Sequence, residues 1–291
     1  MKLRRIGTIR CNVGEGPVWD VLDQALYFVD VTAQLLWRYE PQGGNFTKWK
    51  MPSMIGSLAL REDGGAIVAL QDGFHRFDFQ KNATSPICNP QPDNRTQFND
   101  GKVDRQGRFV AGTRARTLCE PAPRGRLYHL DCNHGARELD EGFGVTNGPC
   151  WSPAGRTFYF SNSLEKVIYA YDYDSGTGAV SNRRVFAETG SFDGIPDGAT
   201  VDSHGNVWVA MCGGAKIVSY GPDGRAARVV DVPVPFVSSV MFGGPDLQQL
   251  YFTSIDGAAV GLTERRDPLS GGLFVIDGLG VRGLSEPRFA G

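Results

Sequence analysis

Short apolar runs separated by turn-forming residues make up most of the chain. Val, Ile and aromatic residues gather in runs of four to six, and Gly, Asp, Asn and Pro stand between them. Residues 108–113, for example, follow the turn-like sequence 104–107, and residues 166–173 alternate between apolar and polar. Such patterns predict β-strands. No convincing amphipathic helix is found, so we expect an all-β fold.

One short pattern occurs six times. Each copy begins with a polar residue, which we call a head, has a turn-like position five residues later, and continues into an apolar strand such as residues 26–29. Subtracting successive head positions gives spacings of 42, 42, 48, 50 and 42 residues. The heads are Glu15, Ser57, Asn99, Asn147, Asp197 and Ser239.

A repeat of this length decides the architecture. Periods of 20–50 residues are typical of solenoids, propellers and arrays, and each unit has room for about four strands. Six heads therefore predict a six-bladed β-propeller, with the heads at one mouth of its central channel. We expect one domain over residues 1–291, and a ring sealed where residues 3–9 meet residues 287–290.

Three of the heads form a candidate metal site. Glu15, Asn147 and Asp197 supply two carboxylates and one amide, an all-oxygen set that suits a divalent cation and leaves positions for water and substrate. Without a cation the carboxylates would repel, and one would tend to hold its proton. Taken singly, each position has an alternative interpretation as a turn, because Asn147 and Asp197 each precede a glycine.

Composition excludes several classes of function. The net charge is −2, from 30 basic and 32 acidic residues, so no nucleic-acid or anionic-membrane partner is expected. No apolar stretch resembles a signal peptide or a membrane span, and the six cysteines lack CxxC spacing. We therefore expect reduced thiols in a cytoplasmic protein. The sequence lacks GxSxG, HExxH, GxGxxG and Walker-type motifs, and four histidines do not suggest a triad.

An ordered set of motifs along nearly the whole chain carries a family resemblance. The motifs are Gly14–Trp19, Phe98–Lys102, Asn147–Gly148, Ser181–Arg184, Ile195–Gly198, Gly271–Phe274 and Gly278–Val281. Together they resemble the senescence-marker-protein / gluconolactonase / luciferin-regenerating-enzyme family.

The resemblance implies a six-bladed propeller with one divalent metal ion in its channel and hydrolysis of sugar lactones. It implies that Glu15, Asn147 and Asp197 are the metal ligands and that Asn99 contacts the substrate. Asp197 would also serve as general base. Family members use Ca²⁺, Zn²⁺, Mn²⁺, Mg²⁺ or Fe²⁺, so the metal is not specified.

This chain departs from the family pattern near Asn99. Regucalcin-like members of the family carry an arginine two residues before this asparagine, where Gln97 stands here, and acidic residues where residues 113–117 are basic. Arg114 and Arg116 begin a Pro-containing segment that extends to residue 126. One interpretation is a solvated hairpin loop. The other is a lid that binds an anionic group of the substrate, since arginine pairs bidentately with carboxylate or sulfonate.

The sequence thus predicts a small-molecule partner, an aldono- or aldaro-lactone, and a monomer or small homo-oligomer. Under the lid interpretation of the basic segment, this lactone carries an acidic group. Two alternatives stay open. One is a metal-dependent esterase or phosphotriesterase on the same propeller. The other is a calcium-binding regulator without enzymatic activity, because fold alone does not fix function.

Overall fold

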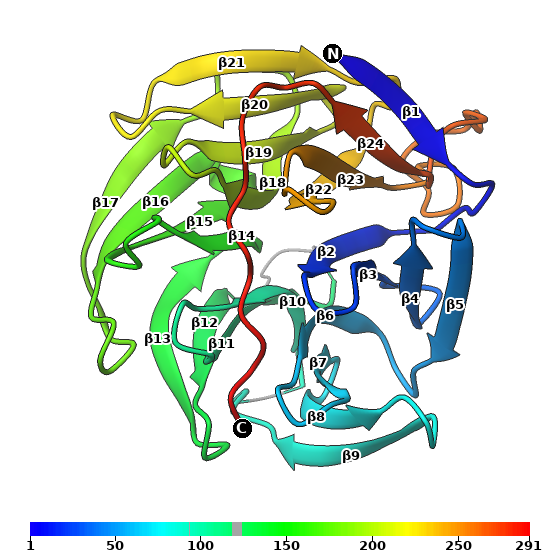
Figure 1. The fold of residues 1–291 in the computed structure, drawn as a ribbon. Helices are drawn as coiled ribbons and strands as arrows, with labels where there is room; N and C mark the ends of the chain where they lie inside the picture. The colour runs from blue at the N-terminus through cyan, green and yellow to red at the C-terminus, as the bar shows by residue number, and fades with distance from the viewer. Residues whose placement is uncertain (93, 118–123) are drawn as a thin grey trace.

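The computed structural model describes residues 1–92, 94–117 and 124–291. Its strands form six four-stranded antiparallel sheets arranged as blades around a central axis (Figure 1). The expected six-bladed, all-β propeller is confirmed. In each blade the strand that begins with the repeat lies nearest the axis, so the six innermost strands surround the channel.

The strand bounds follow the repeat. Blade 1 contains β2 (Gly14–Asp20), β3 (Ala25–Asp30), β4 (Leu35–Glu40) and β5 (Asn45–Lys50). Blade 2 contains β6 (Ile55–Leu60), β7 (Ala66–Leu70), β8 (Gly73–Asp78) and β9 (Ala83–Cys88). Blade 3 contains β10 (Thr96–Val103), β11 (Phe109–Ala115), β12 (Gly125–Leu130) and β13 (Ala136–Phe143).

The second half of the ring is built in the same way. Blade 4 contains β14 (Thr146–Trp151), β15 (Thr157–Asn162), β16 (Val167–Tyr173) and β17 (Val180–Glu188), with the 3-10 helix η1 (Ser163–Glu165) between β15 and β16. Blade 5 contains β18 (Ile195–Val201), β19 (Val207–Cys212), β20 (Lys216–Tyr220) and β21 (Ala226–Asp231). Blade 6 contains β22 (Val237–Gly243), β23 (Gln249–Ser254), β24 (Leu273–Asp277) and β1 (Lys2–Ile6).

Burial decreases from the axis outward, which explains the sequence pattern. The six residues of β3 are all buried and almost entirely apolar, whereas β5 alternates exposed and half-buried positions. A strand covered on both faces needs a continuous apolar run, and an outer strand needs only one apolar face. The same sequence unit therefore encodes both the core of a blade and its solvent edge.

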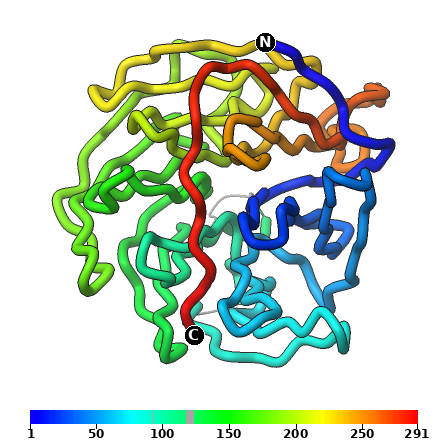
Figure 2. The backbone as a smooth tube through the Cα atoms, viewed as in Figure 1, coloured from blue at the N-terminus to red at the C-terminus, as the bar shows by residue number. Residues whose placement is uncertain are grey.

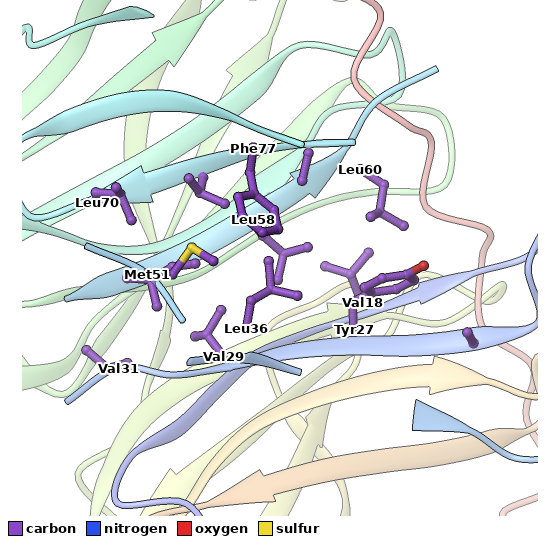
Figure 3. Close-up of a cluster of buried hydrophobic side chains, with 14 residues drawn as sticks. Val18, Tyr27, Val29, Val31, Leu36, Met51, Leu58, Leu60, Leu70 and Phe77 are labelled. Atoms are coloured by element: carbon purple, nitrogen blue, oxygen red, sulfur yellow. The ribbon is translucent and has the colours of Figure 1, made fainter. Parts of the chain in front are cut away.

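Apolar side chains between neighbouring blades hold the ring together. Between blades 1 and 2, Val29 and Leu36 pack toward Leu58, Leu70 and the ring of Phe77 (Figure 3). Burial of each such side chain stabilises the fold by about 1.5–3 kcal/mol. A blade cannot bury its faces alone, so the sheet arrangement requires a closed ring.

The ring is closed by the N-terminal strand. β1 pairs antiparallel with β24, from Lys2 opposite Asp277 to Ile6 opposite Leu273, and completes the last blade. The expectation that residues 287–290 would join this seam is wrong. They lie at blades 2 and 3, where Phe289 pairs with Arg61, because the chain leaves β24 and crosses the face of the ring (Figure 2).

We call residues 278–291 the strap. Along the strap, backbone hydrogen bonds reach hairpins in four blades: Gly283 N to Leu247 O at 2.8 Å, Ser203 N to Arg282 O at 2.8 Å, Phe289 N to Leu60 O at 2.7 Å, and Ala290 N to Gly107 O at 2.9 Å. These hairpins follow the innermost strands, so the strap covers the end of the channel opposite the heads. We refer to these as the strap end and the head end.

Two further findings bear on the expected class of protein. Among the described residues, no helix is long and apolar enough to cross a membrane. Five cysteines are free thiols, namely Cys11, Cys88, Cys132, Cys150 and Cys212. Cys119 lies outside the described residues.

Candidate metal and active site

Each innermost strand is irregular at or beside its head. In β2 the register with β3 shifts between Glu15 and Val18, and in β14 the register with β15 shifts between Asn147 and Cys150. In β18 the shift spans Asp197. A bulge places one extra residue on its strand and redirects side chains, and bulges are frequent beside active sites. The residues at and directly after the heads, which have the sequence of a turn, therefore form bulges within strands. These bulges bring the heads toward the axis.

A chain of hydrogen bonds fixes the two asparagines of the site. Asn99 Nδ2 donates to Asn147 Oδ1 at 2.6 Å and to Thr146 O at 2.9 Å. Asn147 Nδ2 donates to Ser163 Oγ at 2.9 Å, and Ser163 Oγ donates to Pro196 O at 2.6 Å. Because the amide nitrogen of Asn147 is occupied by Ser163, its oxygen is presented on the side of Asn99, with a lone pair left for another partner.

The protein satisfies the two carboxylate heads only in part, and Cys212 and the backbone of Gly198 are the hydrogen-bond partners of Asp197. Asp197 is 5% exposed, and its Oδ1 has no hydrogen-bond partner among the described residues. Burial raises the pKa of Asp197 well above its usual range, and the negative charge of Asp100 raises it further. Burial likewise raises the pKa of Glu15, followed by repulsion from Asp197 and Asp100. Glu15 accepts only the amide of Gly16, at 3.0 Å, among the described hydrogen bonds.

This arrangement fits a divalent cation. A buried carboxylate oxygen without a donor, beside further carboxylates that repel it, costs free energy that a dication would offset. Glu15, Asn147 and Asp197 could hold such an ion through oxygen atoms alone. Within the described residues, no group of three His, Cys, Asp and Glu side chains is placed to hold a metal, so the amide of Asn147 is essential to the candidate set.

Arg114 reaches the head end as well. It is part of β11 rather than of a loop, because the strand continues to Ala115. Its Nε donates to Asn99 Oδ1 at 3.2 Å and its Nη1 to Ala115 O at 3.0 Å. Burial lowers the pKa of Arg114, and the nearby charge of Asp197 opposes this shift. A guanidinium thus bonds the asparagine and lies close enough to Asp197 to interact with its charge.

Gln97 and Arg116 contact mainly protein atoms. Gln97 is buried opposite Arg114 in the strand register, and its Nε2 lies 3.8 Å from Met54 Sδ. Arg116 donates from Nε to Thr96 O at 2.9 Å and from Nη2 to Gln71 O at 3.4 Å. These bonds connect the end of β11 to neighbouring backbone. Residues 118–123 of the expected lid lie outside the described residues.

Sequence analysis singled out Asn99 but not two buried residues that follow it in β10. Asp100 accepts the amide of Gly148 at 2.8 Å, and Lys102 donates from Nζ to Ala199 O at 2.6 Å. Burial raises the pKa of Asp100, and Lys102 opposes the shift. Two charged residues close together in a predicted innermost strand were the available signal, since buried charges are rare unless they are partnered.

Comparison with known proteins identifies relatives that align with nearly the whole chain. Residues 13–256 match the SMP-30/Gluconolactonase/LRE-like region. Regucalcin of Xenopus laevis is 36% identical over 291 residues, which cover 96% of this chain and 95% of that protein. Pentonolactonase XacC of Haloferax volcanii is 34% identical over 295 residues, covering 99% and 98%.

A solved structure agrees in fold. The calcium-binding protein regucalcin of Agrobacterium tumefaciens strain C58 superposes with a TM-score of 0.90 at 25% identity, covering 98% of this chain and 96% of that one. The family match spans most of the chain, and the relatives align along nearly their whole length. The chain belongs to the SMP-30/gluconolactonase/LRE-like family.

Proposed function

We propose that this protein hydrolyses a sugar lactone, an aldono- or aldaro-lactone, to the open-chain sugar acid with the help of one divalent cation. The observation that carries the proposal is the unpartnered, buried Oδ1 of Asp197 at the head end, beside Glu15 and Asn147. The lactonase XacC, a relative along the full chain, supports the substrate class.

The proposed site residues have distinct parts in binding the ion. Glu15, Asn147 and Asp197 would hold the cation, and the all-oxygen set suits a hard cation such as Ca²⁺, Mg²⁺ or Mn²⁺. The calcium-binding description of the bacterial regucalcin supports Ca²⁺ among these. When bound, the ion supplies Lewis acidity at the lactone carbonyl and lowers the pKa of a water molecule.

Asp197 would move the proton. Water adds to the carbonyl carbon as the bond to the ring oxygen breaks, so one proton must leave the water and one must reach the ring oxygen. Asp197 can accept the first and deliver it to the leaving oxygen.

Asn99 and Arg114 would orient the substrate. Asn99 uses its amide nitrogen for Asn147 and Thr146, and its oxygen accepts Arg114. Arg114 uses Nε and Nη1 in bonds among the described residues, which leaves donors on Nη2. A guanidinium with free donors at the substrate side of a carboxylate cluster favours a lactone that carries its own acidic group. Gln97 and Arg116 would support this wall of the pocket.

A hydrolysis screen tests the proposed function. The protein is first chelated, then assayed with a pH indicator against neutral and acidic sugar lactones in Ca²⁺, Zn²⁺, Mn²⁺, Mg²⁺ or Fe²⁺. We expect turnover of at least one lactone that disappears on chelation and returns with a cation. Cation binding without turnover of any lactone would favour the regulator, and turnover of paraoxon or an aryl ester alone would favour the other hydrolase.

Arg114→Ala tests the substrate class. We expect kcat/KM to fall by about 10–100-fold for an acidic lactone, the range of one charge-assisted hydrogen bond, and far less for glucono-lactone. Arg116→Ala, which removes an arginine bonded to backbone carbonyls, should cause the smaller loss. Equal kcat/KM for acidic and neutral lactones, unchanged in Arg114→Ala, would show that the substrate carries no acidic group.

A further inference from the structure

Asp100 and Lys102 form a pair of buried charged residues whose bonds run to other blades. Each is 6% exposed, and both belong to β10 in blade 3. They bond neither the proposed metal ligands' side chains nor each other among the described hydrogen bonds. Across the ring they bond backbone groups just beyond two of those ligands instead. These are the amide of Gly148 in blade 4 and the carbonyl of Ala199 in blade 5.

Asp100 holds the backbone beside Asn147. Its Oδ1 accepts the amide of Gly101 and its Oδ2 the amide of Gly148, each at 2.8 Å. Gly148 has a φ of +56° and leaves no room for a side chain, since a Cβ there would lie 2.8 Å from Asp197 O. The carboxylate therefore fixes the point at which the bulge of blade 4 touches that of blade 5.

Lys102 holds the strand that carries Asp197. Its Nζ donates to Ala199 O at 2.6 Å, two residues beyond Asp197, and so connects blade 3 to blade 5. A buried ammonium is retained only where it has partners. Its positive charge also opposes the shift in the pKa of Asp100, the carboxylate whose negative charge raises the pKa values of Glu15 and Asp197.

We propose that Asp100 and Lys102 are positioning residues, which set the separation of Asn147 and Asp197 through the backbone and thereby the affinity of the site for a divalent cation. This inference rests on the proposed metal set of Glu15, Asn147 and Asp197. Groups that orient metal ligands from outside are worth about 10–100-fold in metal affinity.

Lys102→Met distinguishes two effects on cation affinity, the loss of a positive charge and the loss of the hydrogen bond that positions the backbone. Removing a cation from a carboxylate cluster would by itself strengthen binding of another cation, because repulsion is lost. Loss of the bond to Ala199 would instead weaken it. We expect the Kd for Ca²⁺, measured by titration calorimetry on the chelated protein at 25 °C, to rise by about 10–100-fold.

The matched control is Lys50→Met. Lys50 also donates from Nζ to a backbone oxygen, Ala33 O at 2.8 Å, but it lies on the surface. Its loss should leave the Kd unchanged. If Lys102→Met does not fold, Lys102→Arg keeps the positive charge and changes only the reach of the donor, so that a rise in Kd reports position, and a rise of up to about tenfold is expected.

Kinetics supply a second measurement. With saturating cation the kcat of Lys102→Met should recover toward that of the wild type, while the cation concentration needed for half-maximal rate stays raised. An unchanged or lower Kd in Lys102→Met, with wild-type protein that binds Ca²⁺, would overturn the positioning inference alone. Wild-type protein that binds none of the five cations would overturn the proposed metal site itself.

Discussion

The two ends of the channel use the same residue types in opposite ways. At the strap end Asp20 accepts two hydrogen bonds from Arg288, at 2.6 and 3.1 Å, and Asp104 accepts one from Arg108 at 2.6 Å. At the head end Asp197 has an oxygen without any partner among the described residues. The ends are separated by five residues of strand, or about 16 Å.

The difference shows which carboxylates serve the fold. Asp202 occupies the same position in its repeat as Asp20 and Asp104. It accepts hydrogen bonds from the side chains of Asn206 and Trp208 at 2.8 and 2.9 Å. The carboxylates at the strap end accept hydrogen bonds that stabilise the hairpins and the strap. Those at the head end repel one another, and their cost to stability indicates that they are kept for a ligand.

The largest expected effect comes from removing the unpartnered carboxylate. Asp197→Ala should reduce kcat to below a few per cent of the wild-type value in cation-saturated protein, because the proton acceptor and a proposed ligand are both lost. Turnover of the best lactone from the screen measures this. Asp223→Ala, in an exposed turn, is the control and should keep its activity. Retention of more than a few per cent by Asp197→Ala would show that the head end does not work as proposed.

The opposite substitution at the strap end should damage stability and leave turnover intact. Arg288→Ala leaves Asp20, whose side chain is 3% exposed, without its guanidinium. Breaking a buried ion pair on one side costs about 3 kcal/mol or more, because the remaining charge is uncompensated. Urea unfolding measures the change in the free energy of unfolding.

Arg225→Ala is the matched control for the strap. Arg225 also pairs with an aspartate, Asp223, at 3.9 Å, but its side chain is 89% exposed. Its loss should change the free energy of unfolding by no more than about 0.5 kcal/mol. A loss of kcat in Arg288→Ala as large as that in Asp197→Ala would remove the distinction between the two ends.

The contrast between the ends also marks the limit of sequence reasoning. The spacing of the heads predicted six blades and the placement of Glu15, Asn147 and Asp197 on innermost strands, because a repeat imposes one geometry on every copy. The bulges themselves were not predicted, since Gly after Asn or Asp is equally typical of a turn, which stood as the alternative for each position. Asp100 and Lys102 were missed because their partners are backbone groups of other blades, which no local pattern reveals.

The path of the strap was not predictable for a similar reason. Its bonds to Leu60, Gly107 and Leu247 are backbone bonds to hairpins far away in sequence. Such bonds do not depend on residue type. The pairing of β1 with β24 was anticipated only as closure of the ring, whereas the final residues proved to lie on blades 2 and 3.

The smallest effect concerns a buried histidine close to the paired charges of the strap end. Burial lowers the pKa of His129 to about 4, followed by repulsion from Arg137 and Arg108, and neither ring nitrogen has a partner among the described residues. An unfolded chain has a His pKa of about 6.5, so between pH 6.5 and 4 the unfolded state binds the proton and the folded state does not. Stability is therefore complete above pH 6.5 and decreases as the pH falls toward 4.

The free energy of unfolding should drop by about 2 kcal/mol from pH 7 to pH 5 through this residue, from the difference between the two pKa values. His129→Phe should flatten that part of the profile, measured by urea unfolding at each pH. His204→Phe, at an exposed turn, should not. The profile is measured on chelated protein, where the raised pKa values of the head-end carboxylates make the folded state more stable as pH falls. If the decrease persists in His129→Phe under these conditions, the acid sensitivity arises in neither His129 nor the head-end carboxylates.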